Sequence, residues 1–194
     1  MAQTLINLTK AFVGESQARN RYSIYASAAR KEGFLQVADI FEETANQEKE
    51  HASWFFKMIE IVKTKEGLDV DEVAVNAEAF VKVGTTLENL GYAVAGETHE
   101  HETLYPEFAK VALEEGYQEI AARINAISVA EAHHAERYQK LYTEIKKETL
   151  RNKAEETEWV CTKCGHVHKG KKPAKTCPSC GHDETYAIIK NEVY

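Results

Sequence analysis

Proline and long apolar runs are scarce in this 194-residue chain, and its basic residues are outnumbered by acidic ones. Only three prolines are present while 43% of the residues are hydrophobic, which favours a helical globular core and argues against disorder. No apolar run approaches the ~20 residues of a membrane span, and the N-terminus has no hydrophobic signal segment. A net charge of -7 argues against nucleic acid as the main partner. We therefore expect a cytoplasmic protein with no membrane or nucleic-acid partner.

Cysteine is absent before residue 160 and then occurs in two Cys-x-x-Cys pairs, each followed by glycine. In an intracellular protein this arrangement indicates metal binding rather than disulfides. Four thiolates bind one tetrahedral metal, and the glycines allow backbone amides to approach sulfur. The spacing does not distinguish zinc from iron. The predicted ligands are Cys161, Cys164, Cys177 and Cys180.

Apolar residues recur at helical spacing over most of the first 149 residues, which predicts a mainly α protein with a four-helix bundle. A glycine-broken segment, 66–83, predicts a long crossover that contains a short helix, as in ferritin-like bundles. Thr85 and Glu88 have the form of a capping box, and Pro106 predicts a local break near Glu102. The predicted helices cover 3–31, 34–65, a third beginning at Thr85, and 117–149.

Ionisable residues interrupt the apolar stripe of two of these helices. Glu131 and His134 replace apolar residues in the fourth helix, and Glu48 and His51 do so in the second. An unpaired carboxylate facing a core costs several kcal/mol, so these side chains need a cation to surround. Two Glu-x-x-His pairs on apolar stripes are what a dimetal carboxylate site in a four-helix bundle requires.

The other two helices offer further carboxylates, namely Glu15, Glu97 and Glu100. Five carboxylates have a charge between that of two divalent and two trivalent ions, which suits a pair of irons that cycles between ferrous and ferric. Imidazole and carboxylate ligands also suit manganese or zinc. Tyr22 and Tyr105 are either hydrogen-bond donors to these carboxylates or ordinary core residues.

The chain divides, by composition, into a bundle domain, a charged linker and a small β-rich metal-binding domain. The small domain has short β-like runs at 159–160 and 186–189, and it is too small to bury an adequate core without a metal. The predicted bounds are 1–149, 150–157 and 158–194.

With these motifs the chain closely resembles the rubrerythrin family, which has a ferritin-like diiron domain followed by a rubredoxin-like domain. The resemblance covers nearly all of the chain, including Gly14-Glu15-Ser-Gln-Ala-Arg19, Tyr105-Pro106 and both cysteine pairs. It implies seven diiron ligands, and it implies that one iron exchanges His51 for Glu100 on oxidation. The implied ligands are Glu15, Glu48, His51, Glu97, Glu100, Glu131 and His134.

The resemblance also implies an activity, the reduction of hydrogen peroxide to water in protection against oxidative stress. Electrons would pass through the four-cysteine iron from rubredoxin or an NAD(P)H-dependent reductase. Family members are homodimers in which the four-cysteine site of one subunit lies near the diiron site of the other. The loop between the cysteine pairs is shorter than in free rubredoxins, which bears on the reduction potential.

Two alternatives remain at the level of sequence. One is a ferroxidase that stores iron, which needs a large hollow assembly. The other is a structural or interaction protein in which zinc occupies either site.

Overall fold

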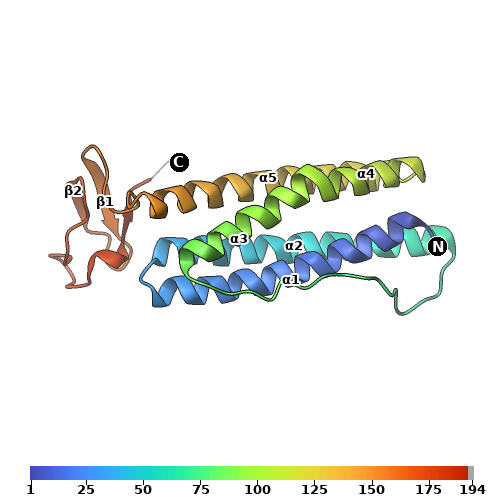
Figure 1. Ribbon diagram of the computed structural model, residues 1–194, viewed down its shortest axis with the longest axis horizontal. Helices are drawn as coiled ribbons and strands as arrows, with labels where there is room; N and C mark the ends of the chain where they lie inside the picture. The colour runs from blue at the N-terminus through green and yellow to red at the C-terminus, as the bar shows by residue number, and fades with distance from the viewer. Residues whose placement is uncertain (192–194) are drawn as a thin grey trace.

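The computed structural model describes residues 1–191 and consists of long helices with a small strand-containing region at one end (Figure 1). The mainly α fold and the four-helix bundle are confirmed, with α3, η1 and α4 together forming the third rod. The bundle elements are α1 (Gln3–Lys31), α2 (Leu35–Glu66), α3 (Thr86–His99), the π-helical turn η1 (Glu100–Leu104), α4 (Tyr105–Glu114) and α5 (Gln118–Lys146). No helix within residues 1–191 is long and apolar enough to cross a membrane.

Glycines in the left-handed region end the first two helices. Gly33 has φ +79°, and the amide of Phe34 donates to the Ala29 carbonyl at 2.8 Å, so the chain reverses after α1. Gly67 ends α2 in the same way with φ +64°. As a result α1 and α2 are antiparallel neighbours, as the sequence predicts.

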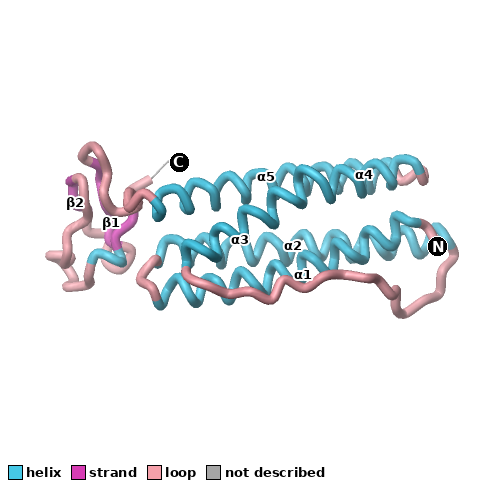
Figure 2. The backbone as a smooth tube through the Cα atoms, in the orientation of Figure 1, coloured by secondary structure: helices cyan, strands magenta, loops and turns pink. Residues whose placement is uncertain are grey.

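The crossover after α2 runs along the bundle as an extended chain (Figure 2). The prediction of a short helix in this segment is wrong, because residues 68–85 have neither helix nor strand. A helix of about 17 residues would span only about 26 Å, whereas α1 with its 29 residues is about 44 Å long. Only an extended chain returns α3 to the starting end of α2, so that α2 and α3 run parallel (Figure 1).

The third rod contains the two local features expected from its sequence. Thr85 accepts a hydrogen bond from the Glu88 amide, and the Glu88 side chain accepts one from the Thr85 amide, which is a capping box. The π-helical turn η1 precedes Pro106, whose missing N–H disrupts the α-helical ladder.

The bundle interior consists of two apolar clusters. One lies towards the N-terminus of the chain and contains Leu8, Phe55 and Ile124; the other lies towards the small domain and contains Tyr22, Phe41 and Tyr138. Along α1, Ala11 belongs to the first cluster and Ala18 to the second, and Glu15 falls between them. The buried carboxylates thus form a polar layer between two apolar ones.

The small region has a three-stranded antiparallel sheet in the order β2-β1-β3. The predicted runs at 159–160 and 186–189 fall in or beside β1 and β3, whereas β2 was not predicted. The elements are β1 (Thr157–Cys161), β2 (Val167–Gly170), the 3-10 turn η2 (Glu184–Tyr186) and β3 (Ala187–Ile189). The last residues of the predicted domain 158–194, 192–194, lie outside the described residues.

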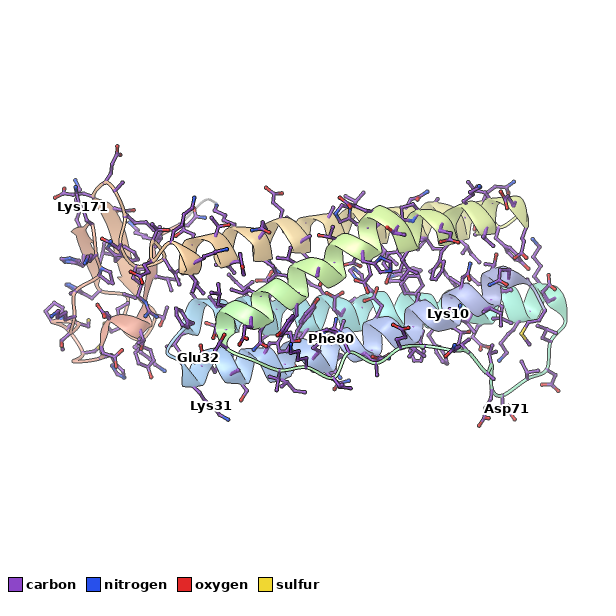
Figure 3. All side chains as sticks on the ribbon, in the orientation of Figure 1. Lys10, Lys31, Glu32, Asp71, Phe80 and Lys171 are labelled. Carbon is purple, nitrogen blue, oxygen red and sulfur yellow. The ribbon has the colours of Figure 1, made fainter. Side chains whose placement is uncertain are left out.

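The segment that joins the two parts packs against the bundle. The Arg151 guanidinium donates to the Gly33 carbonyl and lies over the Phe34 ring, and Lys153 pairs with Glu144. The small region therefore lies at the turn between α1 and α2, where Figure 3 labels Lys31 and Glu32. Helix α5 ends at Lys146 rather than at the predicted residue 149, because Glu148 adopts φ +56°.

Candidate metal centres

Six of the seven predicted bundle ligands meet in the polar layer. They form two overlapping groups whose ligand atoms all lie within 4.8 Å of one another. Glu48 and Glu131 belong to both groups, as two bridging carboxylates would. The first group is Glu15, Glu48, His51 and Glu131, and the second is Glu48, Glu97, Glu131 and His134.

Each imidazole lies against both shared carboxylates. His51 Nδ1 is 2.9 Å from Glu48 Oε2 and 2.8 Å from Glu131 Oε1. His134 Nδ1 is 2.8 Å from Glu131 Oε2 and 3.2 Å from Glu48 Oε1. The two Glu-x-x-His pairs are therefore related across the space between α2 and α5, with nitrogen and oxygen atoms converging from both sides.

Although several of these buried polar atoms lie close to one another, within residues 1–191 they have no hydrogen-bond partner of suitable geometry. They are Glu15 Oε2, Glu48 Oε1, Glu97 Oε2, both carboxylate oxygens of Glu131 and His134 Nδ1. Folded proteins seldom leave so many buried acceptors unsatisfied, since each costs about 1–3 kcal/mol. A pair of cations among these atoms satisfies all of them, so the residues present fit a dimetal centre.

The pKa values describe the same pocket without metal. Burial, reinforced by the charges of Glu48 and Glu131, raises the pKa of Glu97 to about 8. Burial alone would lower the pKa of the imidazoles, but the adjacent carboxylates of Glu131 and Glu48 stabilise the protonated rings and raise the pKa of His51 to about 9 and that of His134 to about 12. Protons therefore neutralise the metal-free cluster.

Two buried tyrosines donate hydrogen bonds to these carboxylates. Tyr22 O–H donates to Glu97 Oε1, and Tyr105 O–H donates to Glu15 Oε1. Of the two roles left open by the sequence, the structure supports that of hydrogen-bond donor. The partner of Tyr22 lies 75 residues away and that of Tyr105 lies 90 residues away, which no local pattern reveals.

Glu100 lies outside both groups. It is the first residue of η1 and is half-buried. Burial raises the pKa of its carboxyl well above the usual range, as do the charges of Glu97, Glu131 and Glu48, so it lies within electrostatic reach of the pocket.

Sequence reasoning missed Arg137, which closes the bundle beside the pocket. Its guanidinium donates to Glu43 Oε1 at 2.9 Å and to the Thr44 hydroxyl, joining α5 to α2. In the sequence, Arg137 follows Ala130 by seven residues and Arg123 by fourteen, which places the three on one side of α5. This spacing does not reveal that Arg137 binds α2.

The four cysteines meet at the small sheet. Cys161 Sγ lies 3.7 Å from Cys180 Sγ, and Cys164 Sγ lies 3.6 Å from Cys177 Sγ. Metal–sulfur bonds of about 2.3 Å place sulfurs about 3.8 Å apart in a tetrahedron, so these sulfurs fit one tetrahedral ion. Cys161 and Cys177 are buried, whereas Cys164 is exposed.

The two cysteine loops have the same geometry, as their sequences predict. Gly165 has φ +74° and Gly181 has φ +75°, conformations that favour glycine. The amide of His166 donates to Cys164 and, with contributions from neighbouring groups, lowers the pKa of that thiol to about 6. His182 Nδ1 lies 3.3 Å from Cys180 Sγ, so it contacts the cluster from its exposed side.

Comparisons with known proteins assign both the helical region and the small cysteine-containing region to one family. The family model described as rubrerythrin matches residues 7–142, and the model for its rubredoxin-like domain matches residues 159–186. A putative rubrerythrin of Methanocaldococcus jannaschii is 47% identical, covering 100% of this chain and 96% of its own. The rubrerythrin of Nitratidesulfovibrio vulgaris is 41% identical, covering 95% of this chain and 93% of its own.

Proteins of known structure agree with this assignment. Partially reduced nigerythrin has a TM-score of 0.61 at 29% identity, with 96% of this chain and 86% of that one covered. The bacterioferritin of Desulfovibrio desulfuricans, at 21% identity and a TM-score of 0.64 over 75% of this chain and 81% of its own, shows the ferritin-like fold. The four cysteines and the carboxylate-imidazole cluster are the candidate rubredoxin-like and diiron centres, and the chain belongs to the rubrerythrin family.

Proposed function

We propose that this protein reduces hydrogen peroxide to water at a diiron site in the bundle, with electrons relayed through the four-cysteine iron. The observation that carries the proposal is the set of buried carboxylate and imidazole atoms that lack hydrogen-bond partners and converge between α2 and α5. Two one-electron metals side by side, next to a third one-electron centre in the same chain, suit a reaction that consumes electrons in pairs.

Within this proposal the six grouped residues divide into shared and terminal ligands. Glu48 and Glu131 would hold both metals, since each belongs to both groups. His51 and Glu15 complete one site, and His134 and Glu97 complete the other. Glu100, displaced onto the π-helical turn, is the alternative ligand to His51 that the family resemblance implies.

A ferrous pair held by these residues would supply two electrons together, the number that reduction of the O–O bond of hydrogen peroxide to water requires. The chain's own residues hold the carboxylates and exclude water. Tyr22 and Tyr105 hold protons against Glu97 Oε1 and Glu15 Oε1, which orients these carboxylates towards the pocket. The apolar clusters on either side keep the pocket dry, which strengthens every interaction between charges within it.

Electron delivery favours a homodimer within this proposal. The small region contacts the α1–α2 turn, and Glu15 lies sixteen residues from the end of α1 at Lys31, about 24 Å along the helix. That separation is long for one electron-transfer step inside a chain. A second copy would bring its four-cysteine iron closer, and the exposed Cys164 offers an edge for exchange with a rubredoxin or an NAD(P)H-linked reductase.

Anaerobic titration of the reduced, iron-loaded protein with hydrogen peroxide tests the proposal. We expect one peroxide to oxidise each diiron pair. The red colour of the thiolate-bound iron should then appear as this iron gives its electron to the pair, and it should bleach again when a reductase supplies electrons. A reduced protein that ignores peroxide and reacts only with oxygen would contradict it. An iron-storage ferroxidase is the alternative, and a solution mass far above that of a dimer or tetramer would favour it.

A further inference from the structure

The six grouped ligands differ in their access to solvent. Glu15, Glu48, Glu97, Glu131 and His134 are at most 3% exposed. The side chain of His51 is 13% exposed. Among the grouped ligands, His51 is therefore where the pocket meets the outside.

The position of His51 on α2 defines the direction of this opening. Gln47, His51 and Trp54 are spaced by four and three residues, so they follow one edge of the helix. All three contact α5: Gln47 accepts a hydrogen bond from Arg137, His51 lies against Glu131, and Trp54 lies under Arg123. The opening therefore lies along the line where α2 meets α5.

Arginine side chains of α5 cross this line on both sides of His51, whereas His51 itself contacts α5 only through the buried carboxylate of Glu131. Arg123, Ala130 and Arg137 follow one another at intervals of seven residues and so share a side of the helix. The Arg123 guanidinium lies 4.0 Å from the centre of the Trp54 ring, and Arg137 is bonded to Glu43. Between these two arginines the same side of α5 carries Ala130, a half-buried residue whose side chain is a single methyl group.

A hollow in the surface begins at one of these arginines. It has a volume of about 320 Å³, and its lining includes Trp54, Met58, Ile120 and Arg123. Trp54 is 37% exposed, and its ring contacts two cations, Arg123 and Lys57, the Nζ of Lys57 being 4.4 Å from the ring centre. Trp54 thus lines the hollow and lies three residues, just under one helical turn, from His51 on the same edge of α2.

We propose that this opening, the His51 window formed by His51, Trp54, Arg123, Ala130 and Arg137, admits hydrogen peroxide to the proposed diiron pocket. Trp54 sets the size limit, so that hydrogen peroxide passes and bulky organic hydroperoxides are rejected. Hydrogen peroxide is small and uncharged, so it needs neither a binding cleft nor a counter-charge to pass the two arginines. The inference rests on the proposed peroxidase function and assigns Trp54 and Ala130 as its specificity-determining residues.

Widening the window is the first test. In the holoprotein, Trp54→Ala should raise the rate with cumene hydroperoxide relative to hydrogen peroxide by about tenfold, the scale on which a pocket discriminates by size. Phe56→Ala removes an aromatic ring of similar exposure from the other side of α2 and should leave the ratio unchanged. An unchanged ratio in Trp54→Ala, or an equal change in Phe56→Ala, would overturn the proposal.

Narrowing the window gives a readout that does not depend on turnover. Cobalt(II) is loaded in place of iron, and a chelator removes it while the weak absorption of carboxylate-bound cobalt is followed apart from the strong thiolate bands. Ala130→Leu should slow removal several-fold and Trp54→Ala should accelerate it, whereas Val129→Leu, on an exposed neighbour, should do neither. Equal rates of cobalt removal in all variants would overturn the proposed window. If these rates differ as expected but the wild-type protein shows no peroxidase activity, the result counts only against the proposed function.

Discussion

His51 Nδ1 on α2 lies 2.8 Å from Glu131 Oε1 on α5, so these two helices contact each other through a pair of candidate metal ligands. Glu48 and His134 make the reciprocal contact at 3.2 Å. A metal pair bound here would replace direct contacts between α2 and α5 with coordination bonds to both helices. Such a centre would join the two helices as well as being a candidate reaction site.

Replacement of a shared carboxylate should empty the bundle pocket. Glu131→Ala removes an oxygen ligand from both groups, so we expect its affinity for the metal pair to fall by at least about 100-fold. The red colour of the thiolate-bound iron should remain. Metal analysis and visible absorption measure the two centres separately, with Glu136→Ala, on an exposed site of the same helix, as the control. Full iron loading of Glu131→Ala would refute a bridging role.

Loss of the Tyr105 hydroxyl should weaken metal binding without preventing folding. Tyr105→Phe keeps the ring packed on Phe55 but removes the donor to Glu15, so that carboxylate loses its orientation. We expect about a 10–100-fold loss of metal affinity in a competition titration with a chelator. Tyr25→Phe, whose hydroxyl donates to the Lys82 carbonyl instead, should bind metal like the wild type. Equal affinities for the two variants would show that the hydrogen bond to Glu15 has no such effect.

Metal binding at the bundle site should release protons and weaken in acid. In the metal-free protein the pKa is about 8 for Glu97, about 9 for His51 and about 12 for His134, so each group holds a proton at pH 7. Because metal must displace these protons, affinity should rise with pH through the range 7 to 9 and fall below it. Calorimetry in buffers of different ionisation enthalpy measures the release, and a binding enthalpy independent of the buffer would contradict it.

Disruption of the cysteine centre should separate electron delivery from the chemistry in the bundle. Cys161→Ser removes one of the four cysteine sulfurs of the candidate iron site and leaves the candidate ligands in the bundle unchanged. We expect steady-state peroxide reduction through a reductase to cease, and a chemically reduced diiron site to complete one turnover at the wild-type rate. Stopped-flow absorption distinguishes the two. Persistence of full steady-state activity would mean that electrons bypass the cysteine centre.

The candidate ligands could be recognised in the sequence because ionisable side chains stand at positions where the helices otherwise carry apolar ones. Glu48, His51, Glu131 and His134 interrupt apolar stripes, and the structure buries all four, His51 less completely than the rest. The capping box at Thr85 and the disruption before Pro106 were equally local signals and are confirmed. Each of these inferences uses residues within two or three helical turns.

Features that depend on contacts between distant elements were not predictable in this way. The crossover has enough apolar residues for a short helix, but the distance it must span requires an extended chain. Tyr22 of α1 can donate its hydrogen bond to Glu97 only when α3 packs beside α1, and Arg137 of α5 can bind Glu43 only when α2 packs beside α5. Strand β2 alternates exposed and half-buried residues and depends on pairing with β1, which its own sequence does not reveal.

The central claim is that the buried carboxylate and imidazole atoms hold two metal ions. Anomalous diffraction at the iron absorption edge, from crystals of the full chain prepared anaerobically with iron, tests it most directly. We predict two peaks among Glu48, Glu131 and the imidazoles of His51 and His134, and a third among the four cysteine sulfurs. A single peak at the cysteines, with the bundle pocket holding only protein and water, would contradict the account.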